Sequence, residues 1–302
     1  MSDDYLIESP ETGFDQVLAF SVPDRDVRGR LVRLGPVLDL ILSAHDYPQP
    51  VKNLLAEALV LATLMGSLLK EADSQLTFQI QAEGGAVDLL VCDYRDGQVR
   101  GYSRHDPDML QELGANPSLE AIFGTGYLAI TFDLAASGER YQGIVPLEGE
   151  TLAGACEAYF ERSEQIPTLL RVAIRAEGDR CVAGGMLVQH LPDGEEGRER
   201  LHVAGDKADW DHAAIMAASV RHAELVDPAL TLEALVWRVY HEEREVRIEP
   251  LATLSRGCRC SPEHYQQVLT SFSESDRAEM RDPDGRIPVE CEFCSKTFRI
   301  EA

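Results

Sequence analysis

The sequence predicts an α+β fold with mainly antiparallel sheets and packed helices, followed by a helical linker and a small C-terminal unit. Two observations support this prediction. Short alternating apolar segments, separated by hairpin-length turns, dominate the first part of the chain, with few helical patterns among them. Four of the seven cysteines lie in two tight pairs within one polar C-terminal segment. We expect a core over residues 1–192, a linker over 193–250 and the cysteine-bearing unit over 251–302.

The core begins with a predicted pair of strands over residues 14–33, which a turn with a proline divides. A helix is expected over 36–44, and prolines in the following turn end it. Residues 51–70 carry the longest helical pattern, whose many apolar positions indicate a helix packed across a sheet. The remaining strands are expected over 76–81, 87–91, 99–103, 127–132, 141–145, 169–175 and 182–189, with a helix over 151–163.

Residues 193–250 differ in character from the core. A charged, glycine-broken loop over 193–197 marks the expected boundary. Helical patterns follow over 209–225 and 231–240. The second of these helices carries an apolar stripe at helical spacing, made of Leu232, Leu235, Val236, Val239 and Tyr240. Because such a stripe is too apolar to stay solvated, we expect it to lie on the core or on the C-terminal unit.

The cysteine pairs form a Cys-x-Cys at residues 258–260 and a Cys-x-x-Cys at 291–294. Two close thiol pairs joined by a loop can place four thiolates around one Zn²⁺, at about 2.3 Å from the metal. The segment has few large apolar residues, and a unit this small rarely folds unaided. We therefore predict one Zn²⁺ per chain in the reduced state, bound by Cys258, Cys260, Cys291 and Cys294.

Three other interpretations of these cysteines remain open from spacing alone. Standing disulfides are disfavoured because the acidic N-terminus lacks the basic region of a signal peptide, so a cytoplasmic location is expected. A thioredoxin-like redox pair at 291–294 is disfavoured because no βαβ pattern surrounds it. A zinc ribbon that touches nucleic acid is disfavoured by charge. The chain has a formal charge of −24, and even residues 251–302 carry 7 basic against 9 acidic side chains.

Composition narrows the class of protein further. An apolar fraction of 44% and a charged fraction of 26% are typical of soluble globular proteins, and no apolar run is long enough to cross a bilayer. We thus expect no membrane and no nucleic-acid partner. Cys92, Cys156 and Cys181 lie in apolar contexts and are expected to be inert core thiols. No catalytic or nucleotide-binding arrangement appears, so no enzymatic activity is expected. One function that these features leave open is that of a thiol oxidoreductase with a zinc-stapled accessory domain.

Several stretches of the chain resemble the bacterial redox-regulated holdase chaperones known as heat shock protein 33, or 33 kDa chaperonin. The matching stretches run along nearly the whole length and cover residues 45–53, 139–143, 147–152, 159–165, 183–187 and 237–243. The family's zinc pattern is Cys-x-Cys, a spacer and Cys-x-x-Cys, which the two pairs of this chain match. The one-residue gap in the first pair sets this pattern apart from an ordinary zinc finger.

The resemblance implies an ATP-independent holdase that is inactive when reduced and zinc-bound. Oxidation would form the disulfides Cys258–Cys260 and Cys291–Cys294 and release zinc, so that the zinc unit and the linker lose their fold. The protein would then bind unfolding client proteins, as a homodimer. The magnitudes support unfolding of the zinc unit when zinc is lost. Structural zinc contributes about 10–16 kcal/mol of binding free energy, whereas a small domain is stable by about 5 kcal/mol or less. We expect the helices over 209–240 to detach from the core when zinc is lost.

Overall fold

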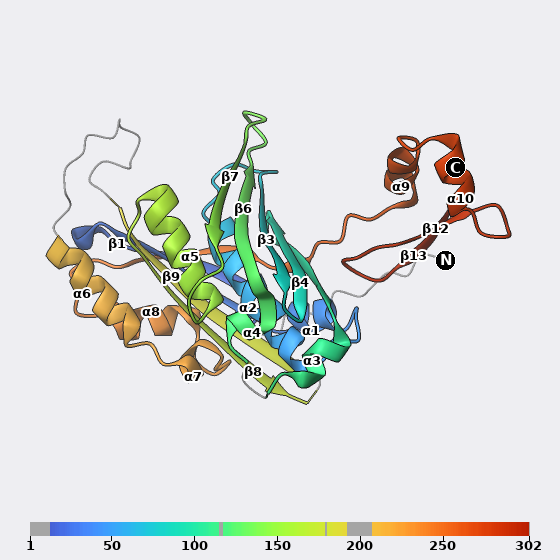
Figure 1. The fold of residues 1–302 in the computed structure, drawn as a ribbon. Coiled ribbons are helices and arrows are strands. Elements are labelled where there is room, and N and C mark those ends of the chain that lie inside the picture. The colour runs from blue at the N-terminus through green and yellow to red at the C-terminus, as the bar shows by residue number, and fades with distance from the viewer. Residues whose placement is uncertain (1–12, 115–116, 179, 192–206, 302) are drawn as a thin grey trace.

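The structure is a computed structural model that describes residues 13–114, 117–178, 180–191 and 207–301. Two sheets lie on either side of one long helix, and a smaller unit of two helices and a hairpin stands beside them (Figure 1). Every strand pair in the described residues is antiparallel except one short parallel pair at a sheet edge. The predicted α+β class with mainly antiparallel sheets is therefore confirmed.

The first sheet has the strand order β10-β1-β2-β9-β8. Its strands are β1 (Gln16–Val22), β2 (Val27–Leu34), β8 (Thr168–Glu177), β9 (Arg180–His190) and β10 (Arg247–Thr253). The second sheet has the order β11-β5-β4-β3-β6-β7. Its strands are β3 (Gln75–Gly84), β4 (Val87–Arg95), β5 (Gln98–His105), β6 (Gly124–Asp133), β7 (Arg140–Pro146) and β11 (Ser255–Arg256). The strands predicted between residues 14 and 189 are all present, with small shifts at their ends.

Helix α2 (Gln49–Gly66) lies between the two sheets and contacts strands of both. Pro50 is in its first turn, where the missing N–H costs nothing. The helix ends before the predicted residue 70. The amides of Leu68 and Leu69 donate to the carbonyls three residues earlier, those of Met65 and Gly66, which is the pattern of a tighter final turn. A Cβ on Gly66 would lie 2.4 Å from the ring of Tyr94, so only glycine allows the helix to approach β4 here.

The other helices show where sequence patterns were insufficient. Helix α1 (Pro36–Leu42) matches its prediction, and α5 (Leu152–Tyr159) ends before residue 163 in a π-turn, Phe160–Glu164. Two short helices, α3 (Pro107–Glu112) and α4 (Leu119–Phe123), were not predicted because they span less than two turns. The loop expected over 193–197 lies outside the described residues.

The helix predicted over 209–225 is wrong as a single element. It consists of α6 (Lys207–Ala218) and α7 (His222–Leu225), separated by a turn. Arg221 is extended and its amide donates to the carboxylate of Glu224, which starts a new helix. Arg171 of β8 also donates to the carbonyl of Val220, so a tertiary contact fixes the break.

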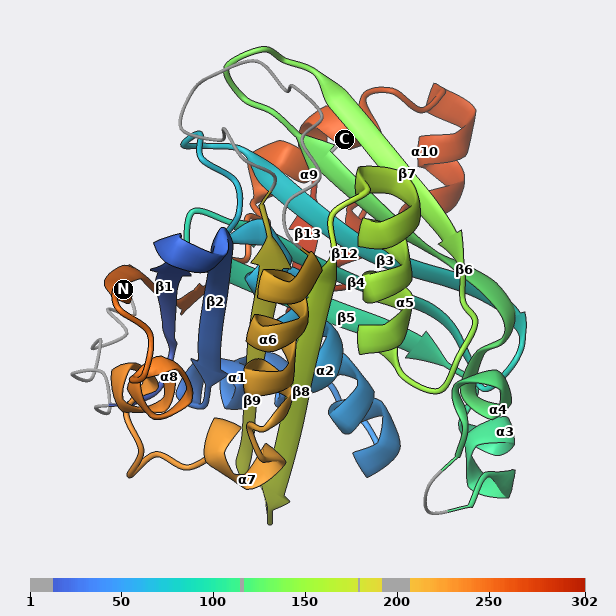
Figure 2. The same ribbon diagram turned by 90° about the vertical axis from the view of Figure 1, so that its left-hand side faces the viewer.

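Helices α6, α7 and α8 (Leu232–Tyr240) cover the face of the first sheet that points away from α2 (Figure 2). The apolar stripe of α8 is buried there against side chains such as Leu18, Phe20 and Leu31. The expectation that this stripe packs on another part of the chain is therefore confirmed for the described structure. Strand β10 follows and runs across residue 250, where we placed the division between the linker and the zinc unit. That division stays a prediction.

The C-terminal unit consists of α9 (Pro262–Leu269), α10 (Glu274–Met280) and a hairpin of β12 (Ile287–Glu290) and β13 (Thr297–Ile300). The buried residues of its apolar cluster are few, namely Leu269, Ile287, Cys291, Phe298 and Ile300. Such a core is too small to stabilise the unit by itself. In the described part of the chain, no helix has the length and hydropathy that crossing a membrane requires.

Candidate metal centre

The first cysteine pair is anchored to the edge of the second sheet. Strand β11 pairs in parallel with β5, and the Gly257 amide continues the pairing by donating to the Val99 carbonyl at 2.9 Å. A Cβ on Gly257 would lie 2.5 Å from the Cβ of Gln98, so glycine permits this close approach. Cys258 follows directly, and its position is thereby fixed relative to the core.

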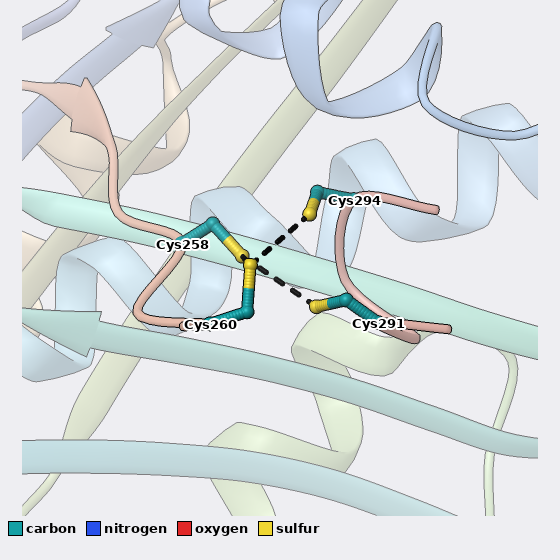
Figure 3. Close-up of side chains that lie close together, drawn as sticks. All are labelled: Cys258, Cys260, Cys291 and Cys294. Carbon is teal, nitrogen blue, oxygen red and sulfur yellow. Dashed lines mark hydrogen bonds between the residues drawn. The ribbon is translucent and has the colours of Figure 1, made fainter. Parts of the chain in front are cut away.

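The second pair lies in the tight turn of the β12–β13 hairpin. The amides of Cys294 and Ser295 both donate to the Cys291 carbonyl, at 3.2 and 2.8 Å. The Cys291 amide in turn donates to the Lys296 carbonyl at 3.1 Å, and Ser295 adopts a left-handed conformation with φ of 52°. This turn directs the thiols of Cys291 and Cys294 to the same side, toward the first pair (Figure 3).

The four sulfur atoms form one compact cluster, with every pair within 4.8 Å. The Sγ atom of Cys258 lies 3.3 Å from that of Cys260 and 3.6 Å from that of Cys291, and the Cys260 and Cys294 Sγ atoms are 3.5 Å apart. Sulfurs at about 2.3 Å from a tetrahedral Zn²⁺ are separated by about 3.8 Å. The donor set and its spacing therefore fit a four-thiolate metal site, and the structure brings all four predicted ligands together.

The electrostatics of the cluster favour a cation. Burial raises the pKa of Cys260, and hydrogen bonding to Cys258 and Cys294 raises it further. Burial also opposes ionisation of Cys291, but hydrogen bonds from the Tyr265 hydroxyl and the Phe293 amide lower its pKa to about 7. Four thiolates this close repel one another, because like charges disfavour ionisation. A divalent metal removes this repulsion and allows all four cysteines to be ionised.

The three remaining cysteines lie apart from this cluster and are buried, as expected. Burial raises the pKa of Cys92 and Cys156 well above the usual value, and it raises the pKa of Cys181 to about 11. Because a raised pKa keeps the thiol protonated, these side chains lack the reactive thiolate.

We expect iodoacetamide at pH 8 to leave Cys92, Cys156 and Cys181 unmodified in the native protein, since only about one Cys181 in a thousand is ionised there. All three should react after denaturation, which serves as the control. Peptide mass spectrometry measures the modified fraction of each residue. Rapid modification of Cys92 in the native chain would contradict the burial described above.

The structure therefore defines a two-sheet α+β protein with a helical segment packed on one sheet and, at the edge of the other sheet, four clustered cysteines that could hold a metal ion. A sequence model described as Hsp33 protein matches residues 15–301. The chain therefore belongs to the Hsp33 family, and the resemblance seen in its sequence is confirmed.

Individual relatives are similar in sequence to this chain over almost its full length. The 33 kDa chaperonin of Caulobacter vibrioides (strain NA1000 / CB15N) is 39% identical over 303 residues, covering 97% of each chain. The 33 kDa chaperonin of Photorhabdus laumondii subsp. laumondii is 37% identical over 288 residues, covering 95% of this chain and 93% of the relative. The crystal structure of the 33 kDa chaperonin (heat shock protein 33 homolog) from Thermotoga maritima has a similar fold. It superposes with a TM-score of 0.77 at 21% identity, covering 95% of this chain and 94% of that one.

Several residues contact the cysteine loops although nothing in the sequence predicted that they would. Asp93, Arg100 and Tyr102 of the second sheet contact the cysteine loops, although they precede them by more than 150 residues. Tyr265 on α9 bonds to Cys291. Their residue types are common on exposed strands and helices, so only the folded structure reveals these contacts.

Proposed function

We propose that this member of the Hsp33 family is a redox-regulated, ATP-independent holdase, inactive when reduced and zinc-bound. The observation that carries the proposal is the compact cluster of Cys258, Cys260, Cys291 and Cys294 in a unit with almost no apolar core of its own. These four side chains would hold one Zn²⁺, which supplies structural cross-linking to the unit. Loss of the metal removes about 10–16 kcal/mol of binding free energy, more than such a unit can replace.

The cluster also makes the site sensitive to oxidants. Metal-bound cysteines are thiolates, the form that attacks peroxide. The O–O bond breaks, the peroxide accepts two electrons, and the cysteine becomes a sulfenic acid. A second thiol two or three residues away then attacks the sulfenic sulfur, displaces water and closes a disulfide. The pairs Cys258–Cys260 and Cys291–Cys294 close the shortest loops, which favours them entropically. Disulfide sulfurs no longer bind zinc as thiolates do, so oxidation and metal release are coupled.

Client binding would use the apolar surface that the linker covers in the reduced state. The stripe of α8 and the facing residues of β1, β2 and β9 are buried against each other. When the linker detaches, both surfaces become available to unfolding proteins, and an exposed patch of this kind is a site of association. The relatives carry the name chaperonin, which agrees with this role. We further propose a cytoplasmic location and a homodimer in the oxidised state.

The test compares reduced and peroxide-treated protein in two assays, metal analysis and suppression of aggregation of a thermally unfolding protein. We expect one zinc per reduced chain, loss of zinc on oxidation, and stoichiometric suppression without ATP only after oxidation. Peptide mapping should find the two short-range disulfides. Well under one zinc per reduced chain, or full retention in a variant with all four ligands changed to serine, contradicts the proposal. Catalytic turnover of a dithiol substrate points instead to the oxidoreductase.

A further inference from the structure

Each cysteine pair encloses a residue that contacts the second sheet. Arg259, between Cys258 and Cys260, lies with its guanidinium 3.6 Å from the carboxylate of Asp93 on β4. Phe293, between Cys291 and Cys294, lies under the guanidinium of Arg100 on β5, at 3.9 Å from the ring centroid. The two metal loops are therefore joined to neighbouring points on the core, and not only to each other.

Asp93 is the centre of these contacts. Its side chain is only 5% exposed and accepts bonds from the Thr77 hydroxyl at 2.7 Å and from Nε of Arg100 at 2.7 Å. Asp93 and Arg100 are directly opposite each other in the β4–β5 register. The buried carboxylate is thus held by the sheet itself, and Arg259 reaches it from the cysteine loop. A charge fixed in this way positions its partner more strongly than an exposed one.

Phe293 is held from two sides. Arg100 covers the face of its ring, and Tyr102, two residues further along β5, meets it edge to face with centroids 4.9 Å apart. The next residue past the second pair, Ser295, hydrogen-bonds to the His45 ring at 2.9 Å, after helix α1. Arg100 thus contacts Phe293 and Asp93 together, and through Asp93 it is connected to Arg259. One sheet residue links both loops.

We propose that Asp93 and Arg100 are positioning residues for the metal centre. They hold the two cysteine loops in register across the junction with the core, so that the core slows the release of the metal. This inference rests on zinc binding by the four cysteines under the proposed function. The guanidinium groups of Arg100 and Arg259 also bring positive charge near the site. Four thiolates carry a charge of −4, which exceeds the +2 charge of the metal by two.

The test is the rate at which reduced, zinc-loaded protein transfers zinc to the chromophoric chelator 4-(2-pyridylazo)resorcinol. Loss of partners outside the ligand set commonly costs about tenfold or more in metal affinity, so we expect about tenfold faster transfer in Arg100→Ala. Asp93→Asn should act in the same direction. Arg100→Lys should be intermediate, because lysine keeps the ion pair but not the planar stack on Phe293.

Arg104→Ala is the matched control. Arg104 is on the same strand and face but pairs with Asp88, and its side chain is 65% exposed. The Arg104→Ala variant should transfer zinc at the rate of the wild type. Protection of α2 from hydrogen exchange should be unchanged in every variant. If the wild-type chain is zinc-loaded and Arg100→Ala matches Arg104→Ala, this inference is wrong and the proposed function stands. Failure of the reduced wild-type chain to hold zinc overturns both.

Discussion

Replacing Leu235 by asparagine and Val236 by threonine should release the linker from the core while the protein is still reduced and zinc-loaded. Both side chains are completely buried against the first sheet. Each fully buried aliphatic side chain contributes about 1.5–3 kcal/mol, so the pair removes about 3–6 kcal/mol of packing free energy. Both replacements keep the number and branching of the side-chain heavy atoms, so the main change is in polarity. We expect lost protection from hydrogen exchange over residues 209–240 and partial suppression of aggregation without oxidant.

The control is Trp237→Gln on the same helix. Trp237 is 60% exposed although it is the neighbour of Val236, so its replacement should leave both linker protection and the resting inactivity unchanged. Equal behaviour of the double variant and the control would show that burial of the α8 stripe does not keep the protein inactive.

Arg33→Met is expected to loosen the linker at a second point. Arg33 on β2 is fully buried, and its guanidinium donates to the carbonyls of Leu225 and Leu230, both at 2.9 Å, and of Glu224 at 3.2 Å. Burial lowers its pKa to about 10, so it remains charged at neutral pH. Methionine replaces only the unbranched stem of the arginine side chain and donates no hydrogen bonds. It leaves buried carbonyls unsatisfied at a cost of about 1–3 kcal/mol each.

Two further variants sharpen this prediction. Gly184 on β9 is paired with Arg33, and a Cβ there would lie 2.3 Å from the Leu225 carbonyl oxygen. Gly184→Ala should therefore displace the same turn of the linker. Arg30→Met is the control, since Arg30 lies on the same strand but donates to the carbonyls of Gly29 and Ser67 in the core. Hydrogen exchange over residues 222–240 should increase in the first two variants and not in the control. An increase only in the control would refute the role of Arg33.

The sequence predicted those features whose cause is local. Alternation identified the strands between residues 14 and 189, and cysteine spacing identified four residues that the structure brings together. The break between α6 and α7 escaped prediction because the contact of Arg171 with the Val220 carbonyl is tertiary. Strand β10 also escaped, because its sequence contains Pro250 and charged residues. It becomes a strand by pairing with the open edge of β1.

The sequence also did not predict where the two cysteine loops, residues 258–260 and 291–294, contact the core. Arg100 and Asp93 form an ordinary cross-strand pair of opposite charges, which a sequence would assign to a solvated face. Only the folded chain places Phe293 and Arg259 on them. The sequence therefore identifies the four-cysteine unit and the helical segment separately, whereas the contacts that connect them to the core are visible only in three dimensions.

We expect oxidation of the four cysteines to release zinc and thereby to detach the linker, which would expose the client-binding surface. Hydrogen exchange over residues 209–240, followed during peroxide treatment together with zinc release and suppression of aggregation, measures this coupling. Protection of this segment should fall as zinc leaves, and suppression of aggregation should rise with the same time course. Suppression that appears while residues 209–240 remain as protected as in the reduced protein would contradict this coupling.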